Sequence, residues 1–282
     1  MIKGKNLALI IATCLIVVGI VIFVFAASIN KWDMEKLSTN NYKSQTYTIV
    51  ESFNDISINT SVSNITFELS DDSSCKLVCY EQENEKHTFK LENNTLSISQ
   101  ENTKKWYEYI SISFKSPKLT IYLPQKEYNN LLINNSTGDI TLSQELSFQN
   151  VDIKTSTGKV KVESISTQKL QINSSTGDTH LENIRCSAFK SNGSTGNCYL
   201  ENLIANEEIS ITRSTGDITF KKCDSESINV KTNTGDVSGT LCTGKFFTTK
   251  TSTGEIEIPQ STSGGKCHIT TSTGDITIEI SE

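Results

Sequence analysis

A four-residue motif, Ser-Thr-Gly-Asp or a close variant, recurs eight times in the second half of this 282-residue chain. Successive motif glycines are separated by 19 or 20 residues throughout. A constant period of this size is typical of a solenoid, in which each repeat buries its apolar side only by stacking on the next. The motif glycines are Gly138, Gly158, Gly177, Gly196, Gly216, Gly235, Gly254 and Gly274. We therefore predict a stack of similar coils.

The residues around each glycine alternate between apolar and polar. In the first repeat, Leu131 and Ile133 precede the glycine and Ile140 and Leu142 follow it, and most later repeats keep apolar residues at these four positions. Side chains in a strand alternate between faces, so each repeat should contain two short strands around an apolar interior. The predicted fold class is all-β, a parallel β-solenoid of eight 19–20-residue coils over residues 131–282.

The motif itself has a structural interpretation and a functional one. Glycine adopts positive φ without steric cost, and Ser, Thr and Asp form local hydrogen bonds in turns. The alternative is a metal ladder, since an acidic residue such as Asp139 often follows the glycine. Calcium requires about six to eight converging oxygens, its β-roll repeat is a nonapeptide, and Lys159 would place a cation in the row. The turn interpretation is favoured, and no metal or cofactor is expected.

Residues 46–130 should form an N-terminal β region that caps the solenoid. The stretch 56–69 resembles a repeat whose turn has lost its Gly-Asp, as expected of a terminal coil. Within this region Trp106, Tyr107 and Tyr109 follow two lysines. Aromatic residues beside cations are common at interfaces and also cover strand edges, so these three are candidate partner contacts as well as candidate packing residues.

An uncharged apolar segment near the N-terminus predicts a membrane anchor. It begins at Leu7, ends at Ala27 and would span about 31 Å as a helix, enough to cross a bilayer. Lysines concentrate just before it, which favours a cytoplasmic N-terminus over residues 1–6. We expect a single-pass cell-membrane protein with a linker at 28–45 and an extracytoplasmic solenoid.

Two alternatives to a retained anchor remain open. The sequence Ala26-Ala27-Ser28 could be cleaved as the end of a secretory signal, although such signals have shorter apolar cores of about 7–15 residues. Cys14 lies in a weak lipoprotein-like box inside the apolar run. The retained signal anchor is favoured because of the length of the segment.

The chain has eight cysteines, which would imply disulfides in an exported protein. Several of them occupy apolar columns of the repeat, where a free cysteine acts as a small hydrophobe. Cys223 and Cys242 should stack on adjacent coils about 4.8 Å apart, within reach of a disulfide, so a bridge and two buried thiols are both open. No Cys-x-x-Cys pair occurs, and His87, His180 and His268 have no clustered cysteines or carboxylates at metal-ligand spacing, so we interpret the histidines as solvated.

The Ser-Thr-Gly-Asp-Ile repeats, the preceding strand that ends Ile121-Tyr-Leu123-Pro124 and the degenerate coil before them resemble the bacterial putative-adhesin β-strand-repeat family, a domain of unknown function. The resemblance covers roughly residues 46–282. It implies a surface or envelope protein, sometimes linked to envelope-stress responses. It supplies no catalytic residues.

The favoured function is a non-catalytic, membrane-anchored adhesin or scaffold that contacts an envelope protein or a glycan. A net charge of −6 argues against nucleic-acid binding, which needs a basic surface. One alternative is a carbohydrate-active β-helix enzyme, which would need acidic and basic side chains gathered at one level of the outward columns. A less favoured alternative is ice binding, because the column three residues after glycine mixes Thr141 with Lys161 and His180.

The last predicted strand, over residues 276–280, should leave an unpaired parallel edge at the end of the stack. Glu279 and Glu282 would guard this edge with charge, or the edge would serve for docking and self-association.

Overall fold

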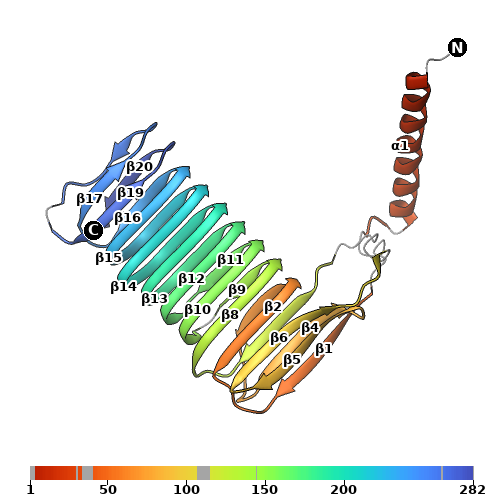
Figure 1. Cartoon of the computed structure of the whole chain (residues 1–282), viewed down its shortest axis with the longest axis horizontal. Coiled ribbons are helices and arrows are strands. Elements are labelled where there is room, and N and C mark those ends of the chain that lie inside the picture. The colour runs from red at the N-terminus through yellow and green to blue at the C-terminus, as the bar shows by residue number, and fades with distance from the viewer. Residues whose placement is uncertain are drawn as a thin grey trace.

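In a computed structural model, the described residues are 4–29, 31–33, 41–106, 115–143, 145–261 and 263–281. The predicted all-β solenoid is confirmed and has about seven turns, with one helix at the N-terminus. Figure 1 shows the stacked coils and, at one end, a group of differently oriented strands.

Helix α1 (Gly4–Ile29) contains the predicted anchor. Its large apolar side chains from Leu9 to Ile29 are exposed, whereas Ala27 near its C-terminal end is buried. Residues Ala8–Ile29 are long and apolar enough to cross a membrane, a criterion that an N-terminal signal sequence also meets. The helix therefore fits a single-pass anchor.

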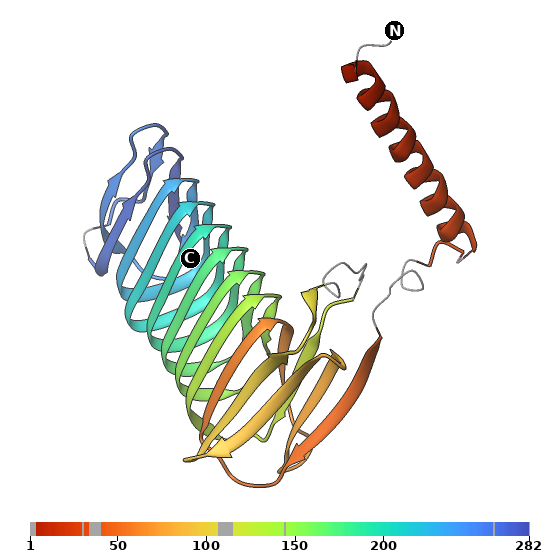
Figure 2. The ribbon, with the colours of Figure 1, turned by 45° about the vertical axis from the view of Figure 1, so that its right-hand side comes forward.

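The repeats form two-stranded coils that stack in parallel and in register. On one face Leu131, Val151 and Leu170 align in one column, and on the other Ile140 aligns with Val160. These side chains are almost fully buried, so the predicted apolar columns are the core. The strands are β8 (Glu127–Thr137), β9 (Ile140–Leu142), β10 (Ser147–Thr157), β11 (Val160–Glu163), β12 (Ser166–Thr176), β13 (Thr179–Thr195), β14 (Cys198–Thr215) and β15 (Ile218–Thr234). The last three continue round a corner from one face to the other, which Figure 2 shows from the side.

The region before the repeats continues the parallel stack only in part. Strands β2 (Asp55–Val62) and β3 (Asn64–Leu69) pair with β8 and β9 as an additional coil, and β6 (Thr95–Asn102) and β7 (Lys118–Leu123) pair in parallel on their outer side. Beyond them, β1 (Tyr42–Ile49), β4 (Cys75–Gln82) and β5 (Glu85–Glu92) are antiparallel to their neighbours. The region before the repeats is therefore a parallel extension of the stack followed by antiparallel strands.

Local turn chemistry explains this change of direction. Asn93 and Asn94 join β5 to β6 and have φ values of 49° and 63°. Two consecutive residues with positive φ form a type I′ turn, which connects antiparallel strands directly. This hairpin makes β5 antiparallel to β6 at this end of the stack.

The coils at the other end are out of sequence order. Strand β19 (Gly265–Thr270) lies between β15 and β17 (Lys245–Lys250), and β20 (Ile276–Ile280) lies between β16 (Val237–Leu241) and β18 (Ile256–Glu257). Our prediction that residues 276–280 form the open edge is therefore wrong, because β20 is paired on both sides. The outermost coil is β17–β18, and Glu279 does not guard the end of the stack; Glu282 lies outside the described residues.

Candidate functional site

The motif glycines form the turn that closes each coil. Their φ values lie between 128° and 145°, a range that side-chain-bearing residues rarely adopt. A Cβ atom added to Gly158 would lie 2.1 Å from the carbonyl oxygen of Gly138, and the other turns are as close. Neighbouring turns therefore touch backbone to backbone, and only glycine fits.

Where the residue after the glycine is Asp or Asn, its side chain ties the turn to the adjacent one. The Asp139 carboxylate accepts a hydrogen bond from the Lys159 backbone N–H at 2.8 Å, and the Asp178 carboxylate accepts one from Asn197 N–H at the same distance. These hydrogen bonds join coils that are adjacent in space even where they are not consecutive in sequence. The Asp275 backbone N–H donates to the Asp236 carboxylate, because β20 lies beside β16. These carboxylates act in the turn, as the structural interpretation predicted.

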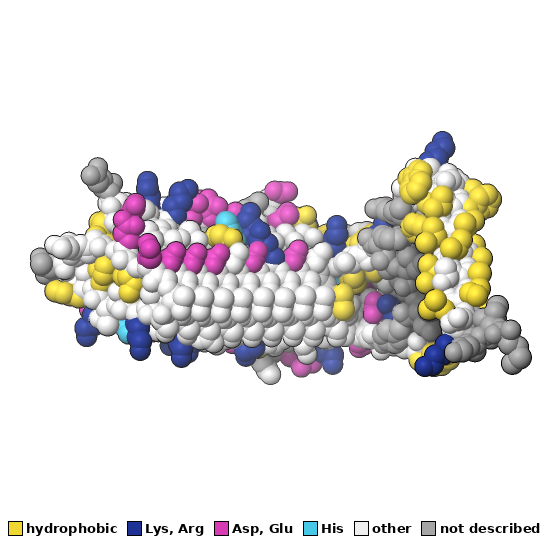
Figure 3. Space-filling view, turned by 90° about the horizontal axis from the view of Figure 1, so that it is seen from above, with side chains coloured by type: hydrophobic (Ala, Val, Ile, Leu, Met, Phe, Trp, Pro, Cys, Tyr) yellow, Lys and Arg dark blue, Asp and Glu magenta, His cyan; other side chains and the backbone are white. Residues whose placement is uncertain are grey.

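Two columns of hydroxyl side chains lie exposed beside these turns. The threonine before each glycine is exposed in all eight repeats, and so is the residue before it, which is serine in every repeat except at Asn233. Stacked strands are about 4.8 Å apart, so the hydroxyls form a regular array. Figure 3 shows a broad uncharged surface over the coils, bordered by a row of acidic side chains. The irregular column of Thr141, Lys161 and His180 lies on other strand positions, so its irregularity does not extend to this array.

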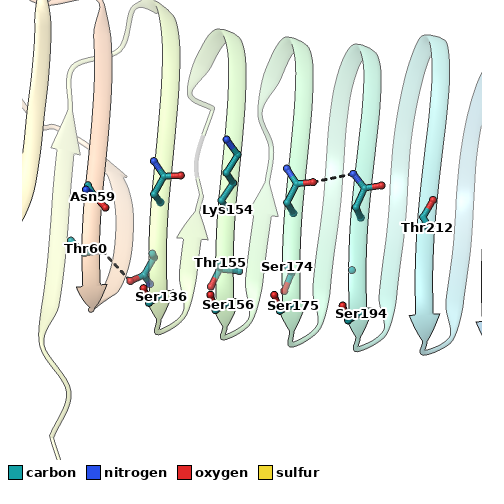
Figure 4. A pocket seen from close by; sticks show the side chains of 15 residues that line it. Asn59, Thr60, Ser136, Lys154, Thr155, Ser156, Ser174, Ser175, Ser194 and Thr212 are labelled. Atoms are coloured by element: carbon teal, nitrogen blue, oxygen red, sulfur yellow. Dashed lines mark hydrogen bonds between the residues drawn. The ribbon is translucent and has the colours of Figure 1, made fainter.

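An open groove of about 530 Å³ adjoins the hydroxyl array and crosses β2, β8, β10, β12 and the ends of β13 and β14 (Figure 4). Its outward side chains include Asn134, Lys154, Asn173 and Asn192, and Asn192 Nδ2 donates to Asn173 Oδ1 at 2.9 Å. The lining thus combines hydrogen-bond donors and acceptors. Lys154 carries the single formal charge among the 15 lining residues.

Two polar residues that occupy apolar columns of the repeat, Thr179 and Ser191, accept hydrogen bonds from a buried arginine. Arg213 is almost fully buried, and its Nη2 donates to Thr179 Oγ1 at 3.2 Å and to Ser191 Oγ at 2.9 Å. Gly193 lies against it, since a Cβ there would meet Arg213 Nη1 at 2.9 Å. Arg213, Thr179 and Ser191 thus form one internal hydrogen-bond network, and Gly193 lies between the arginine and the groove that it lines.

All eight cysteines are free thiols. A shift in register places Leu241, and not Cys242, opposite Cys223, so the Cys223–Cys242 bridge that we had left open does not form. Cys242 is only partly buried, whereas burial raises the pKa of the Cys223 thiol to about 11 and that of Cys186 to about 12. The buried thiols act as core residues.

The interpretation of all three histidines as solvated is wrong for His87. This ring is buried, and its Nδ1 lies 2.8 Å from Glu81 Oε2. Cys79, Glu81 and His87 each place a potential ligand atom within 4.8 Å of the others. The sequence spacing concealed this cluster because β4 and β5 bring it together across the interior. His180 lies beside the Tyr199 ring, and His268 is exposed, as expected.

The aromatic segment remains a prediction. Trp106 is 77% exposed. Tyr107 and Tyr109 lie outside the described residues.

Comparison with solved structures finds one that shares this fold and others with weaker similarity. A putative adhesin from Bacteroides fragilis is 24% identical, with 84% of this chain and 97% of that chain covered and a TM-score of 0.57. A putative adhesin and a putative lipid-binding protein from Parabacteroides distasonis are 11% and 14% identical; each alignment covers 85% of this chain and 98% of the other, with TM-scores of 0.47 and 0.46. No curated protein matches the sequence.

The family model described as Toastrack DUF4097 matches residues 53–206 and 189–282, which together include most of the chain and every coil of the solenoid. The chain belongs to the Toastrack DUF4097 family.

Proposed function

We propose that this protein is a non-catalytic, membrane-anchored surface-interaction module whose groove and hydroxyl array bind a glycan of the cell envelope. The observation that carries the proposal is the groove lined by asparagine, serine and threonine along successive coils. Amide and hydroxyl groups both donate and accept hydrogen bonds, as sugar hydroxyls do. A periodic row of such groups matches a ligand that is itself a repeating polymer.

The rigidity of the scaffold supports this function. The groove residues lie on strands that pair on both sides, and the turns beside them are held by backbone contacts. Binding to preformed groups avoids the entropy cost of ordering flexible side chains and loops. A flat, regular surface can therefore bind a polymer through many weak contacts at once.

The composition of the groove also distinguishes binding from hydrolysis. Most glycoside hydrolases use two carboxyl groups on either side of the scissile bond. The residues that line the groove include Lys154 but no aspartate or glutamate. This favours an adhesin or scaffold over the carbohydrate-active enzyme.

The proposed location places α1 in the cell membrane, the N-terminus in the cytoplasm and the solenoid outside. The apolar helix supports the anchor, and the lysines before it support the orientation. The B. fragilis neighbour is described as a putative adhesin, which agrees with an extracellular role. The family resemblance favours a further link to the envelope-stress response.

A binding experiment with the full chain in detergent tests this function. We expect saturable binding to purified cell-wall glycans, reduced at least tenfold when Asn134, Asn173 and Asn192 are all changed to Ala. The matched control changes Thr141, Thr219 and Thr277 to Ala in an outward column away from the groove. A separate Trp106→Ala variant tests the aromatic segment. Equal binding by the groove and control variants would exclude the groove, and turnover of the glycan would overturn the non-catalytic function.

Self-association is a second candidate function, because the outermost coil exposes apolar side chains. On β17 and β18, Phe246 is 54% exposed and Ile256 is 44% exposed. An open strand edge with apolar side chains favours pairing with a second copy of the chain. We expect a Phe246→Lys variant to lower the dimer fraction in sedimentation experiments; a wild type that stays monomeric at high concentration would refute this candidate.

A further inference from the structure

The cluster of Cys79, Glu81 and His87 lies between the two layers of the fold at its N-terminal end. Cys79 and Glu81 are two residues apart on β4 and face the interior together. Strand β4 pairs with β1 and β7 in one layer, whereas β5, which carries His87, pairs along its length with β6 in the other. The three side chains therefore meet across the interior.

Hydrogen bonds orient two of these side chains but leave part of each unused. Glu81 Oε2 accepts from the His87 backbone N–H at 2.6 Å and lies 2.8 Å from His87 Nδ1. In the described part of the chain, Glu81 Oε1 and His87 Nε2 are buried without a hydrogen-bond partner. Buried polar atoms are nearly always paired. Two unpaired atoms beside a thiol therefore indicate that the cluster accommodates a further group.

We propose that Cys79, Glu81 and His87 bind one divalent transition-metal ion, with Zn²⁺ the best match. Thiolate, imidazole and carboxylate are the three protein ligands that zinc uses. Calcium and magnesium bind through oxygen atoms and do not suit a site with sulfur and nitrogen. Three protein ligands leave a fourth position for water in a tetrahedral site.

The geometry requires only a small adjustment. Zinc–sulfur and zinc–nitrogen distances of about 2.3 and 2.0 Å place neighbouring tetrahedral ligands about 3.5 Å apart. The ligand atoms lie within 4.8 Å of one another, so each pair must approach by about 1.3 Å at most to reach this separation. Side-chain rotation supplies movements of this size.

The surroundings give the ion a structural role. The Tyr47 ring packs edge-on against Phe89 at 4.9 Å between ring centroids, and these residues come from β1 and β5, in opposite layers. Leu77, on the same face of β4, is fully buried. An ion held here would join the two layers where the parallel coils have ended.

The test uses the untagged full chain in detergent, reduced and freed of metal by chelation, with Zn²⁺ and Co²⁺ as probes. We expect one equivalent of Zn²⁺, a higher unfolding temperature on its addition, and for Co²⁺ a thiolate charge-transfer absorption. Cys79→Ala and His87→Gln should each lower the affinity at least tenfold, and Cys79→Ala should also abolish the charge-transfer band. Cys75→Ala, another buried cysteine on β4, and His268→Gln, an exposed histidine, should bind as the wild type does.

Two results would overturn the proposal. The first is the absence of Zn²⁺ and Co²⁺ binding by the folded, reduced wild type. This result, which requires no variant, would mean that the cluster is only a buried His–Glu pair. The other is binding by Cys79→Ala and His87→Gln that equals the wild type, which would place the ion elsewhere. Circular dichroism of each variant distinguishes loss of the site from loss of the fold.

Discussion

Replacing Gly177 by alanine should destabilise the solenoid far more than a typical glycine substitution. Gly177 has φ of +132°, and an added Cβ would lie 2.1 Å from the carbonyl oxygen of Gly158 and 2.7 Å from its carbonyl carbon. Real Cβ contacts are essentially never shorter than 3.0 Å, so the two backbones would have to separate by about 0.9 Å. The turns on either side stack in the same way and oppose this movement.

Two terms set the size of the effect. Holding a non-glycine residue in a sparsely populated backbone region costs about 1–3 kcal/mol. Forcing extra atoms into a packed site costs about 1–3 kcal/mol more. We therefore expect a loss of about 2–6 kcal/mol, a large fraction of the roughly 5–15 kcal/mol that stabilises a typical native protein.

The matched control is Gly193→Ala, in the next coil. Gly193 has no left-handed φ, and its added Cβ would meet the Arg213 side chain at 2.9–3.0 Å, which can shift more easily than a backbone carbonyl. Urea unfolding of the detergent-solubilised chain, followed by far-ultraviolet circular dichroism, should show a loss at Gly193 less than half of that at Gly177. Losses equal within about 0.5 kcal/mol would refute the argument from turn stacking.

Three further predictions concern the ladder of turns, the thiols and the order of the coils. Lys159→Asn should stabilise the fold by about 1 kcal/mol in urea unfolding. The new amide oxygen could accept a hydrogen bond from the Asp178 backbone N–H, as the Asn197 amide oxygen accepts one from the Asp217 backbone N–H. Lys159→Leu, which has no acceptor, should give no such gain. Burial raises the pKa of the Cys186 thiol from 9.0 to about 12, so its contribution to stability is complete below about pH 9 and is lost as the pH rises toward 12. The free energy of unfolding, measured across alkaline pH, should therefore fall less steeply in Cys186→Ala than in the wild type. An unchanged slope would contradict this origin. Hydrogen exchange should be slow in β20 and fast in β18, and the reverse order would contradict the observed pairing.

The sequence predicts the coil in detail because each position of the repeat has one environment. Leu131, Val151 and Leu170 share a column and face the same core, so a period of 19 or 20 residues defines both faces and the turn. The order of the coils is different. Strands β15, β17 and β19 present the same pattern of columns and could each pair with either of the others, so the periodicity contains no information about which coil lies outermost.

The buried cluster could not be predicted for a related reason. His87 lies outside the repeat, and its distance from Glu81 depends on how β4 and β5 separate after their hairpin into opposite layers. Spacing along the chain describes neighbours on one strand and not neighbours across a core. The hydroxyl array, in contrast, was visible in the columns and needed only the structure to show that both of its positions are exposed.

The interleaving of coils at the two ends constrains how this protein can change in evolution. Strand β2 lies between β6 and β8, and β19 lies between β15 and β17, so each end depends on a segment that leaves the stack and returns. Duplicating or deleting a repeat there would break this arrangement. The plain coils between β8 and β15 follow one another in order and tolerate such events. Relatives should therefore differ in length by whole coils in the middle of the array, while both ends keep their topology.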